Sequence, residues 1–154
     1  MVPMDLKSYY LDTSALVKRY VTEPGSETVD KVFNEAYSSI AILNTSYWNI
    51  GEAAGVFDKY GMRLGLDSRK VFLTLLRELK LLSRENKLTI INVSPKILRE
   101  SIKLVFKHHI YLADALQIES ARSVDAEIIL TGDKRLSEIA KEEGFKVVFL
   151  KEDI

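Results

Sequence analysis

The sequence contains no cysteine and only two histidines, His108 and His109, in 154 residues. The absence of cysteine excludes disulfide bonds and metal sites built on thiolates. Two adjacent histidines are too few for a histidine-rich zinc site. A bound metal ion would therefore need oxygen ligands, which favour magnesium, manganese or calcium.

The chain also lacks an excess of charge and a long apolar run. Its 22 basic and 22 acidic residues give a formal net charge of zero, which argues against a generic polyanion-binding protein. A local basic rim remains compatible with this balance, and its candidates are Lys18, Arg19, Lys134 and Arg135. No apolar run approaches the roughly 20 residues that span a bilayer, and the opening "MVPMDLKSYY" is too short and polar for a signal peptide. We therefore expect a cytoplasmic protein without membrane association.

Hydrophobic periodicity divides the chain into alternating strands and helices, with no internal repeat. Such alternation specifies a central parallel sheet covered by helices on both faces. We expect a single α/β domain over residues 1–154, a three-layer sandwich of about five strands with Rossmann-like topology. The predicted strands are 8–11, 38–43, 88–93, 127–132 and 146–150, and the predicted helices are 14–21, 26–37, 44–61, 66–86, 94–109, 111–124 and 133–144.

Two predicted helices have further features. Helix 44–61 is expected to be capped by Asn44 or Thr45 and to stop at Gly61. Helix 66–86 has an apolar stripe that does not include two of its leucines, Leu73 and Leu81. A second apolar face of this kind indicates either a binding partner or a helix packed on both sides, and both interpretations stay open.

Two aspartates follow predicted strands. Asp12 comes directly after "SYYL", and Asp133 comes after "IILTG". In a parallel sheet the functional crevice lies outside the carboxyl ends of the strands, so both carboxylates are expected at one edge of the sheet. Each could instead be a helix N-cap. Thr13 and Ser14 are also available to cap the first helix, which would leave Asp12 free, whereas capping and metal binding can coexist at Asp133.

Two further acids lie in apolar stretches of predicted helices. Glu52 occurs in "NIGEAAGVF" and Asp114 in "YLADALQI", both interpreted as mid-helix positions. Neither has a lysine or arginine three or four residues away, so a local salt bridge is excluded. A carboxylate is seldom buried unless it is paired or binds a metal. A tertiary ion pair remains the alternative for each, and the small residues around Glu52 suit a closely packed helix.

Four carboxylates at one sheet edge would repel one another strongly. A divalent cation removes that repulsion, and magnesium or manganese suits a site made of carboxylates and waters. Such an ion activates water as a nucleophile and screens charge that develops on a phosphate. We therefore expect Mg²⁺ or Mn²⁺ at this edge, where hydroxyl groups can orient the ligands. The expected ligands are Asp12, Glu52, Asp114 and Asp133, and the expected supporting hydroxyls are Ser14 and Thr131.

The sequence resembles the PIN-domain ribonucleases, most closely the VapC-like toxins of bacterial and archaeal toxin–antitoxin pairs. The resemblance runs the length of the chain and is carried by "YYLDTSALVKRYVTEPGSE", "NIGEAAGVF", "YLADALQIESA" and "IILTGDKRLSEIAKEEGFKVV". The acids match the family pattern in order and separation, with 40 residues from Asp12 to Glu52, 62 to Asp114 and 19 to Asp133.

The resemblance implies that RNA is the substrate and that an activated water hydrolyses its phosphodiester bonds. It implies one or two magnesium or manganese ions at the four acids, with Ser14 and Thr131 assisting. It also implies a homodimer and a small antitoxin protein that covers the site.

Three alternatives remain open at this stage. A housekeeping RNA-processing PIN nuclease would carry the same residues as a toxin. A receiver-like or phosphohydrolase domain phosphorylated on Asp12 would share the strand-end aspartates, but it does not explain Glu52 on a helix. A catalytically inactive PIN-like module that binds RNA or protein would share the fold, although the presence of all four acids counts against it.

Overall fold

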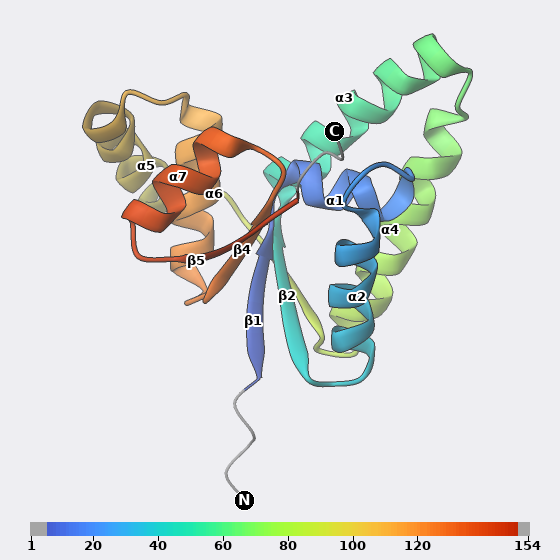
Figure 1. Cartoon of the computed structure of the whole chain (residues 1–154), viewed down its shortest axis with the longest axis horizontal. Helices are drawn as coiled ribbons and strands as arrows, with labels where there is room; N and C mark the ends of the chain where they lie inside the picture. The colour runs from blue at the N-terminus through green and yellow to red at the C-terminus, as the bar shows by residue number, and fades with distance from the viewer. Residues whose placement is uncertain (1–5, 151–154) are drawn as a thin grey trace, which may run out of the picture.

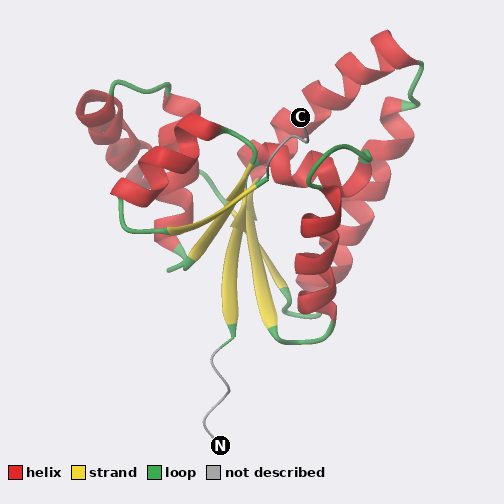
Figure 2. Ribbon diagram, in the orientation of Figure 1, coloured by secondary structure: helices red, strands yellow, loops and turns green. Residues whose placement is uncertain are grey.

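The computed structural model describes residues 6–150, which contain a five-stranded sheet with helices on both faces (Figure 1; Figure 2). Every pair of neighbouring strands is parallel, and the order across the sheet is β3-β2-β1-β4-β5. The expected α/β class with a central parallel sheet is confirmed. The strands are β1 (Lys7–Leu11), β2 (Ala41–Ser46), β3 (Leu88–Ile91), β4 (Ile128–Thr131) and β5 (Lys146–Phe149).

The helices form two layers, and β1 contributes side chains to the core under each. Tyr9 and Leu11 belong to the core on one face, whereas Tyr10 belongs to the core on the other, because successive side chains of a strand point to opposite faces. The predicted three-layer sandwich is thus confirmed (Figure 1). One layer consists of α1 (Thr13–Tyr20), α2 (Ser26–Tyr37), α3 (Tyr47–Leu64) and α4 (Ser68–Arg84), and the other of α5 (Pro95–His108), α6 (Leu112–Ser123) and α7 (Lys134–Glu142).

The strand order locates the functional crevice. From β1 the chain proceeds outward through β2 to β3, and β4 and β5 then extend the sheet from the other side of β1. The crevice of such a sheet is expected where the order reverses, at the carboxyl ends of β1 and β4. Receiver domains have the order 2-1-3-4-5 instead, so this topology removes the receiver-like alternative.

The second strand begins later than predicted. It was expected at 38–43, but β2 is Ala41–Ser46, and Ser39 has a left-handed backbone (φ 61°) in the turn that follows α2. The prediction failed because the strand ends in polar residues. These residues remain in the sheet because their side chains bond to β1: Asn44 Nδ2 donates to Tyr9 O at 2.9 Å, and Thr45 Oγ1 donates to Leu11 O at 3.0 Å.

The limits of α3 also differ from the prediction. Its N-cap is Ser46, rather than Asn44 or Thr45, and Ser46 forms a capping box with Asn49. The helix continues past Gly61 and stops at Gly65, whose φ of 72° is the left-handed conformation that favours glycine.

Two glycines beside Glu52 do not support the close helix packing that was expected there. A Cβ atom added at Gly51 or at Gly55 would meet no atom within 4 Å outside the helix. Both glycines are exposed, whereas Ala53 is fully buried in the core, so the small residues allow close packing at Ala53 and not at the glycines.

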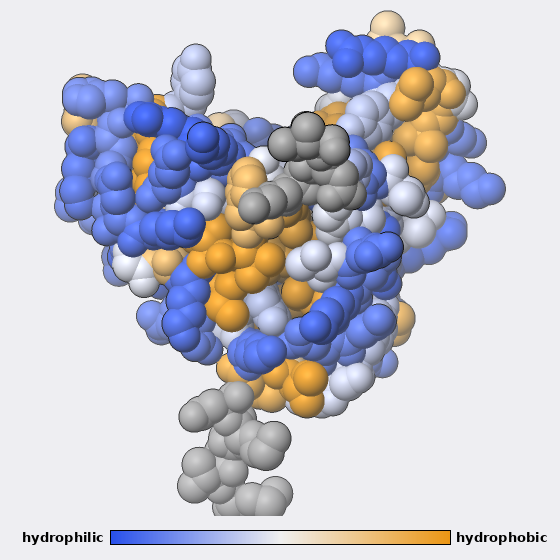
Figure 3. Space-filling view, viewed as in Figure 1, coloured by the Kyte–Doolittle hydropathy of each residue, from blue (hydrophilic) through white to orange (hydrophobic). Residues whose placement is uncertain are grey.

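The second apolar face of α4 is confirmed as an exposed surface. Leu75 and Leu79 are fully buried, whereas Leu73 and Leu81 are 48% and 47% exposed. The alternative of a helix packed on both sides is therefore not supported. On the face drawn in Figure 3 apolar surface gathers near the strands at the centre, and other exposed apolar side chains include Met62 and Leu64 at the end of α3 and Phe106 on α5. Within residues 6–150, no helix combines the length and apolar character that a membrane crossing requires.

Candidate active site

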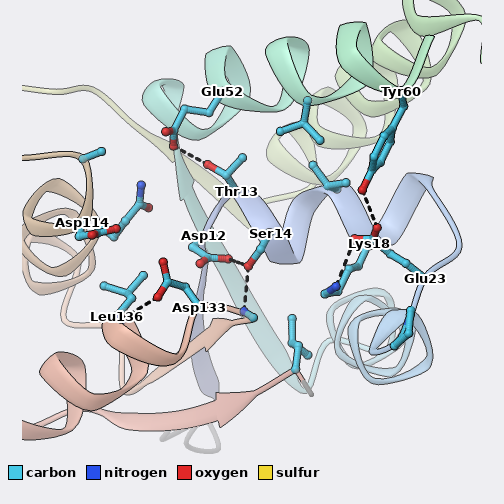
Figure 4. Close-up of a pocket in the computed structure, with 17 residues that line it drawn as sticks. Asp12, Thr13, Ser14, Lys18, Glu23, Glu52, Tyr60, Asp114, Asp133 and Leu136 are labelled. Carbon is cyan, nitrogen blue, oxygen red and sulfur yellow. Dashed lines mark hydrogen bonds and ion pairs between the residues drawn. The ribbon is translucent and has the colours of Figure 1, made fainter. Parts of the chain in front are cut away.

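A pocket of about 420 Å³ lies at the carboxyl ends of β1 and β4. It is lined by all four predicted acids, Asp12, Glu52, Asp114 and Asp133 (Figure 4). The prediction that these side chains lie at one edge of the sheet is confirmed. Their roles as metal ligands and catalytic groups stay predictions.

Asp12 is buried, and both of its carboxylate oxygens accept hydrogen bonds. One oxygen accepts hydrogen bonds from the Ala15 N–H at 2.9 Å and from the Ser14 hydroxyl at 2.6 Å, which makes Asp12 the N-cap of α1. The other accepts a hydrogen bond from the Thr131 hydroxyl. The expectation that Thr13 or Ser14 caps this helix was wrong, because both already belong to its first turn. Capping uses the same carboxylate that lines the pocket, so the two roles coexist.

Two hydroxyl groups connect the junction after β1 with the junction after β4. Thr131 Oγ1, which donates to Asp12, accepts a hydrogen bond from the Asp133 N–H at 2.9 Å. Ser14 Oγ accepts one from the Gly132 N–H at 2.8 Å. Asp133 is the N-cap of α7, as its alternative interpretation proposed. Ser14 and Thr131 thus contact Asp12 as the sequence suggested, and their supporting role in catalysis stays a prediction.

Glu52 contacts Thr13, which was not among the predicted site residues. Glu52 Oε1 accepts a 2.6 Å hydrogen bond from the Thr13 hydroxyl (Figure 4). Thr13 Oγ1 accepts one in turn from Asn49 Nδ2 at 3.0 Å. Within residues 6–150 Glu52 forms no ion pair, so the tertiary salt bridge that was its alternative explanation is not present.

Thr13 is connected through Asn49 to a buried network of polar side chains. The Tyr10 hydroxyl lies 2.6 Å from Asn49 Oδ1 and 2.8 Å from Gln117 Oε1, and Asn49 Nδ2 donates to Gln117 Oε1 at 2.7 Å. Burial raises the pKa of Tyr10 far above its ordinary value, so the hydroxyl stays protonated as a donor. One signal could have revealed this network. Asn49 lies three residues before Glu52, and Gln117 lies three residues after Asp114, so each shares a helix face with an acid.

Replacing Thr13 with valine tests whether this contact orients Glu52. The substitution keeps the shape of the side chain but removes the hydroxyl that donates to Glu52. The resemblance to PIN-domain ribonucleases makes RNA cleavage the activity to measure, and we expect it to fall roughly 10- to 100-fold, the usual effect of losing a group that orients a metal ligand. Steady-state rates at several magnesium concentrations would measure it. Thr13→Ser retains the hydroxyl and is the matched control, and a Thr13→Val protein that cuts as fast as Thr13→Ser would contradict the role.

Asp114 lies in the first turn of α6 rather than in mid-helix as predicted. Acidic side chains are favourable there because they face the positive end of the helix dipole. Asp114 forms no ion pair within residues 6–150. Burial raises its pKa, and the charges of Asp133 and Glu52 raise it further, while Arg135 lowers it.

The pKa of Asp12 is also raised, and the shift is large. Burial raises the pKa of its carboxyl group from 3.8 to about 6, and the charge of Asp133 adds to the increase. The hydrogen bonds from Ser14, Thr131 and Ala15 oppose this shift without cancelling it. The acids thus disfavour one another's ionised forms, which is the condition that a divalent cation relieves.

The local basic rim that the sequence left possible does not include two of its four candidates. Arg19 turns away from the pocket and pairs with Glu78 of α4, with Nε 2.9 Å from Oε1. Lys18 lines the pocket but is only 7% exposed. Lys134 and Arg135 are exposed at the start of α7, so they alone could contribute to a rim.

The four carboxylates are the type of ligand that an oxygen-preferring divalent ion binds, although they do not converge on a single point in this structure. No three carboxylate or imidazole groups among the described residues are placed to hold a metal ion in this conformation. Asp133 is exposed and Glu52 and Asp114 are partly buried, so all three are accessible from the pocket beside the buried Asp12. Carboxylates without cationic partners in one pocket suit magnesium or manganese.

A family model for the PIN domain matches residues 9–142. The chain belongs to the PIN domain family. The four acids therefore line a pocket of a PIN domain, as the sequence resemblance implied. A comparison with curated proteins gives no match.

Solved structures with this fold include several toxins. The PIN domain is similar to VapC20 of Mycobacterium tuberculosis, described as a Sarcin-Ricin loop cleaving toxin, with TM-score 0.62, 12% identity and coverage of 89% of this chain and 95% of that chain. It is similar to VapBC2 of Rickettsia felis bound to a DNA fragment from their promoter (TM-score 0.64, 18% identity, coverage 95% and 99%). A toxin-antitoxin complex from Klebsiella pneumoniae is also similar (TM-score 0.61, 20% identity, coverage 94% and 99%). At these identities the likeness shows the shared fold.

Proposed function

We propose that this PIN domain is a metal-dependent endoribonuclease that hydrolyses RNA phosphodiester bonds. The observation that carries the proposal is the gathering of four carboxylates, none with an ion-pair partner in the described residues, in one pocket at the carboxyl ends of β1 and β4. Mg²⁺ or Mn²⁺ bound there would supply an activated water and neutralise charge on the phosphate. The ligands would be Asp12, Glu52, Asp114 and Asp133.

The chain's own residues position these ligands. The α1 cap and the Thr131 hydroxyl hold Asp12, the ligand with the least freedom to move. Thr13 orients Glu52 and is itself held by the buried Asn49. Pre-positioned ligands of this kind lower the cost of assembling the site when the ion and the substrate bind.

We further propose that the protein is the toxin of a toxin–antitoxin pair, acting as a homodimer that a small antitoxin binds. The similar toxins and toxin–antitoxin complexes support this, as does the exposure of Leu73 and Leu81 on α4. A housekeeping RNA-processing PIN nuclease would need the same pocket. A short adjacent reading frame that encodes a DNA-binding protein with a flexible tail would favour the toxin.

A catalytically inactive PIN-like module that binds RNA or protein is the second candidate. One observation favours it, namely that no three carboxylates of the described residues converge on a point. Calorimetric titration with Mg²⁺ and Mn²⁺ separates the two candidates. Absence of binding in the millimolar range would favour the inactive module.

Cleavage of single-stranded RNA is expected to require a divalent ion. Purified protein should cut labelled RNA with Mg²⁺ or Mn²⁺ and leave it intact with EDTA, because without the ion the carboxylates repel the phosphate and leave its developing charge unscreened. Gel analysis of the products would measure this. Excess Mg²⁺ added after EDTA should restore cleavage, and cutting that persists in EDTA would contradict the proposal.

A further inference from the structure

The pocket has a second end, built from different residues, where a buried lysine lies. Lys18, Glu23 and Tyr60 line the same pocket as the four acids (Figure 4). Lys18 Nζ lies 3.1 Å from Glu23 Oε1, and the Tyr60 hydroxyl donates to Glu23 Oε2 at 2.8 Å. The side chain of Lys18 is 8% exposed and that of Glu23 is 23% exposed. The glutamate is therefore the more accessible partner of this pair.

Packing fixes the carbon chain of Lys18. A Cβ atom at Gly132 would lie 3.4 Å from Lys18 Cε, and one at Gly25 would lie 3.2 Å from Lys18 Cδ and 3.1 Å from Leu150 Cβ. Gly25 has a φ of 96°, which also disfavours any other residue. Gly25 thus leaves room for the lysine because it lacks a side chain, and Gly132 packs beside it at an ordinary contact distance. The ammonium group is held in the wall of the pocket.

Lys18 is the only lysine, arginine or histidine among the described residues that line this pocket, which also contains five carboxylates. Such a pocket repels the phosphates of RNA unless cations lie along their path. Ion binding at the four acids would provide positive charge at one end. Lys18 is the one basic side chain in this lining that can provide it at the other.

The spacing on α1 suits two neighbouring phosphates. Ser14, which contacts Asp12, and Lys18 are four residues apart on one face of the helix, about 6 Å along its axis. This is similar to the separation of successive phosphates along a nucleic-acid strand. Because Lys18 and the four acids line one pocket, a strand whose scissile phosphate lies at the carboxylates would pass Lys18 with a neighbouring phosphate.

We propose that Lys18 binds a phosphate next to the scissile one and that Glu23 is the counter-ion which this phosphate displaces. The inference rests on the proposed ribonuclease function and adds a substrate subsite to it. In the free protein Glu23 neutralises the buried ammonium, which would otherwise be costly to bury. When RNA binds, Glu23 keeps the Tyr60 hydroxyl as its donor and remains partly exposed to water.

Two substitutions in this one ion pair are expected to change RNA binding in opposite directions. Lys18→Met retains the buried carbon chain and removes the charge, so binding should weaken roughly tenfold. The slope of log Kd against log salt should become less steep by about 0.7, the value for one phosphate contact on a single strand. Glu23→Gln removes the competing charge, so binding should become tighter. A pair with only a structural role would not give this opposition.

The measurement is fluorescence anisotropy with labelled single-stranded RNA at constant Mg²⁺, in an Asp114→Asn background that is expected not to cut it. Lys31→Met, an exposed lysine on α2, is the matched control. Equal affinity and slope for Lys18→Met and Lys31→Met would overturn the subsite, and so would weaker binding by Glu23→Gln. If Lys18→Met does not fold, Glu23→Gln decides, because misfolding cannot tighten binding. Cleavage by the wild-type protein tests the proposed function separately: absence of cleavage with Mg²⁺ or Mn²⁺ would overturn that function, whereas cleavage together with equal salt slopes for Lys18→Met and Lys31→Met would overturn the subsite alone.

Discussion

An Asp12→Asn protein is expected to fold normally and to cut RNA at least about 10³-fold more slowly than the wild type. Asparagine lacks the negative charge that a divalent ion needs from this ligand. It also places an amide nitrogen on one of the two positions now occupied by carboxylate oxygens. Loss of one well-placed electrostatic group commonly costs 10²–10³ in rate, and a ligand that also positions the ion is expected to cost at least the upper value.

The fold should survive because asparagine is as good an N-cap as aspartate. Its amide oxygen can still accept the hydrogen bond from the Ala15 N–H, and its amide NH₂ can donate to Thr131 Oγ1. Asp67→Asn is the matched control, since Asp67 is the exposed N-cap of α4 and accepts from the Lys70 N–H at 3.2 Å outside the pocket.

Single-turnover cleavage rates, with circular dichroism to verify the fold, would measure the effect. An Asp12→Asn protein that cuts within tenfold of Asp67→Asn would show that Asp12 is a structural cap alone. The proposed metal site would then have to be built from the other three acids.

The sequence predicted the position of the acids better than the boundaries of the elements that carry them. Asp12 and Asp133 could be placed because a parallel sheet brings its strand ends to one edge, whatever the exact strand limits are. Glu52 and Asp114 could be placed because neither had a local cation to explain its apolar surroundings. None of these inferences depended on a helix beginning at a particular residue.

The predicted strand and helix boundaries were wrong where polar side chains form hydrogen bonds to backbone carbonyl groups of a neighbouring strand. Asn44 and Thr45 look like turn residues, yet they lie in β2 because their side chains bond to the carbonyls of β1. Thr13 and Asn49 were missed for a related reason, because they act through contacts between side chains that are distant in the sequence. A hydroxyl or an amide is identified as part of a site by the group it contacts, and the contacts here join residues 36 to 39 positions apart.

Lys18 illustrates a second limit of sequence reasoning. In "LVKRY" it is one of two adjacent basic residues, and both were candidates for an exposed rim. The structure separates them, with Arg19 paired to Glu78 and Lys18 in the pocket wall. Their difference arises from the direction of each side chain around α1 and from Gly25, which makes room for the lysine.

The metal-free protein is expected to lose stability as the pH rises from 3.8 to about 6, because of Asp12. Burial raises the pKa of Asp12 in the folded state, so the folded protein keeps a proton that the unfolded chain releases near pH 3.8. The folded state thus binds more protons in this window, and the free energy of unfolding falls as the pH increases. The pKa of Asp12 differs by roughly two units between the two states, which corresponds to about 3 kcal/mol in the free energy of unfolding.

Urea unfolding of wild type and Asp12→Asn, both in EDTA, measures this contribution. Other acids titrate in the same range, and the pKa values of Glu78 and Glu143 are lowered, which has the opposite effect on stability. The two proteins share these groups, so the difference between their unfolding free energies isolates Asp12. We expect Asp12→Asn to gain about 3 kcal/mol relative to wild type between pH 3.8 and about 6. If the unfolding free energies of the two proteins changed in parallel between pH 3.8 and about 6, the pKa of Asp12 would be the same in the folded and unfolded states, which would contradict the prediction.

Adding Mg²⁺ should reverse this relationship above about pH 6, where Asp12 is ionised. An ion that binds the folded protein alone stabilises it by mass action, and the repulsion among the acids is replaced by attraction to the ion. Wild type should then become more stable with increasing Mg²⁺, while Asp12→Asn responds weakly. The expected instability of the metal-free protein and the divalent-ion binding that we propose for it would have one cause, the burial of Asp12 beside other carboxylates.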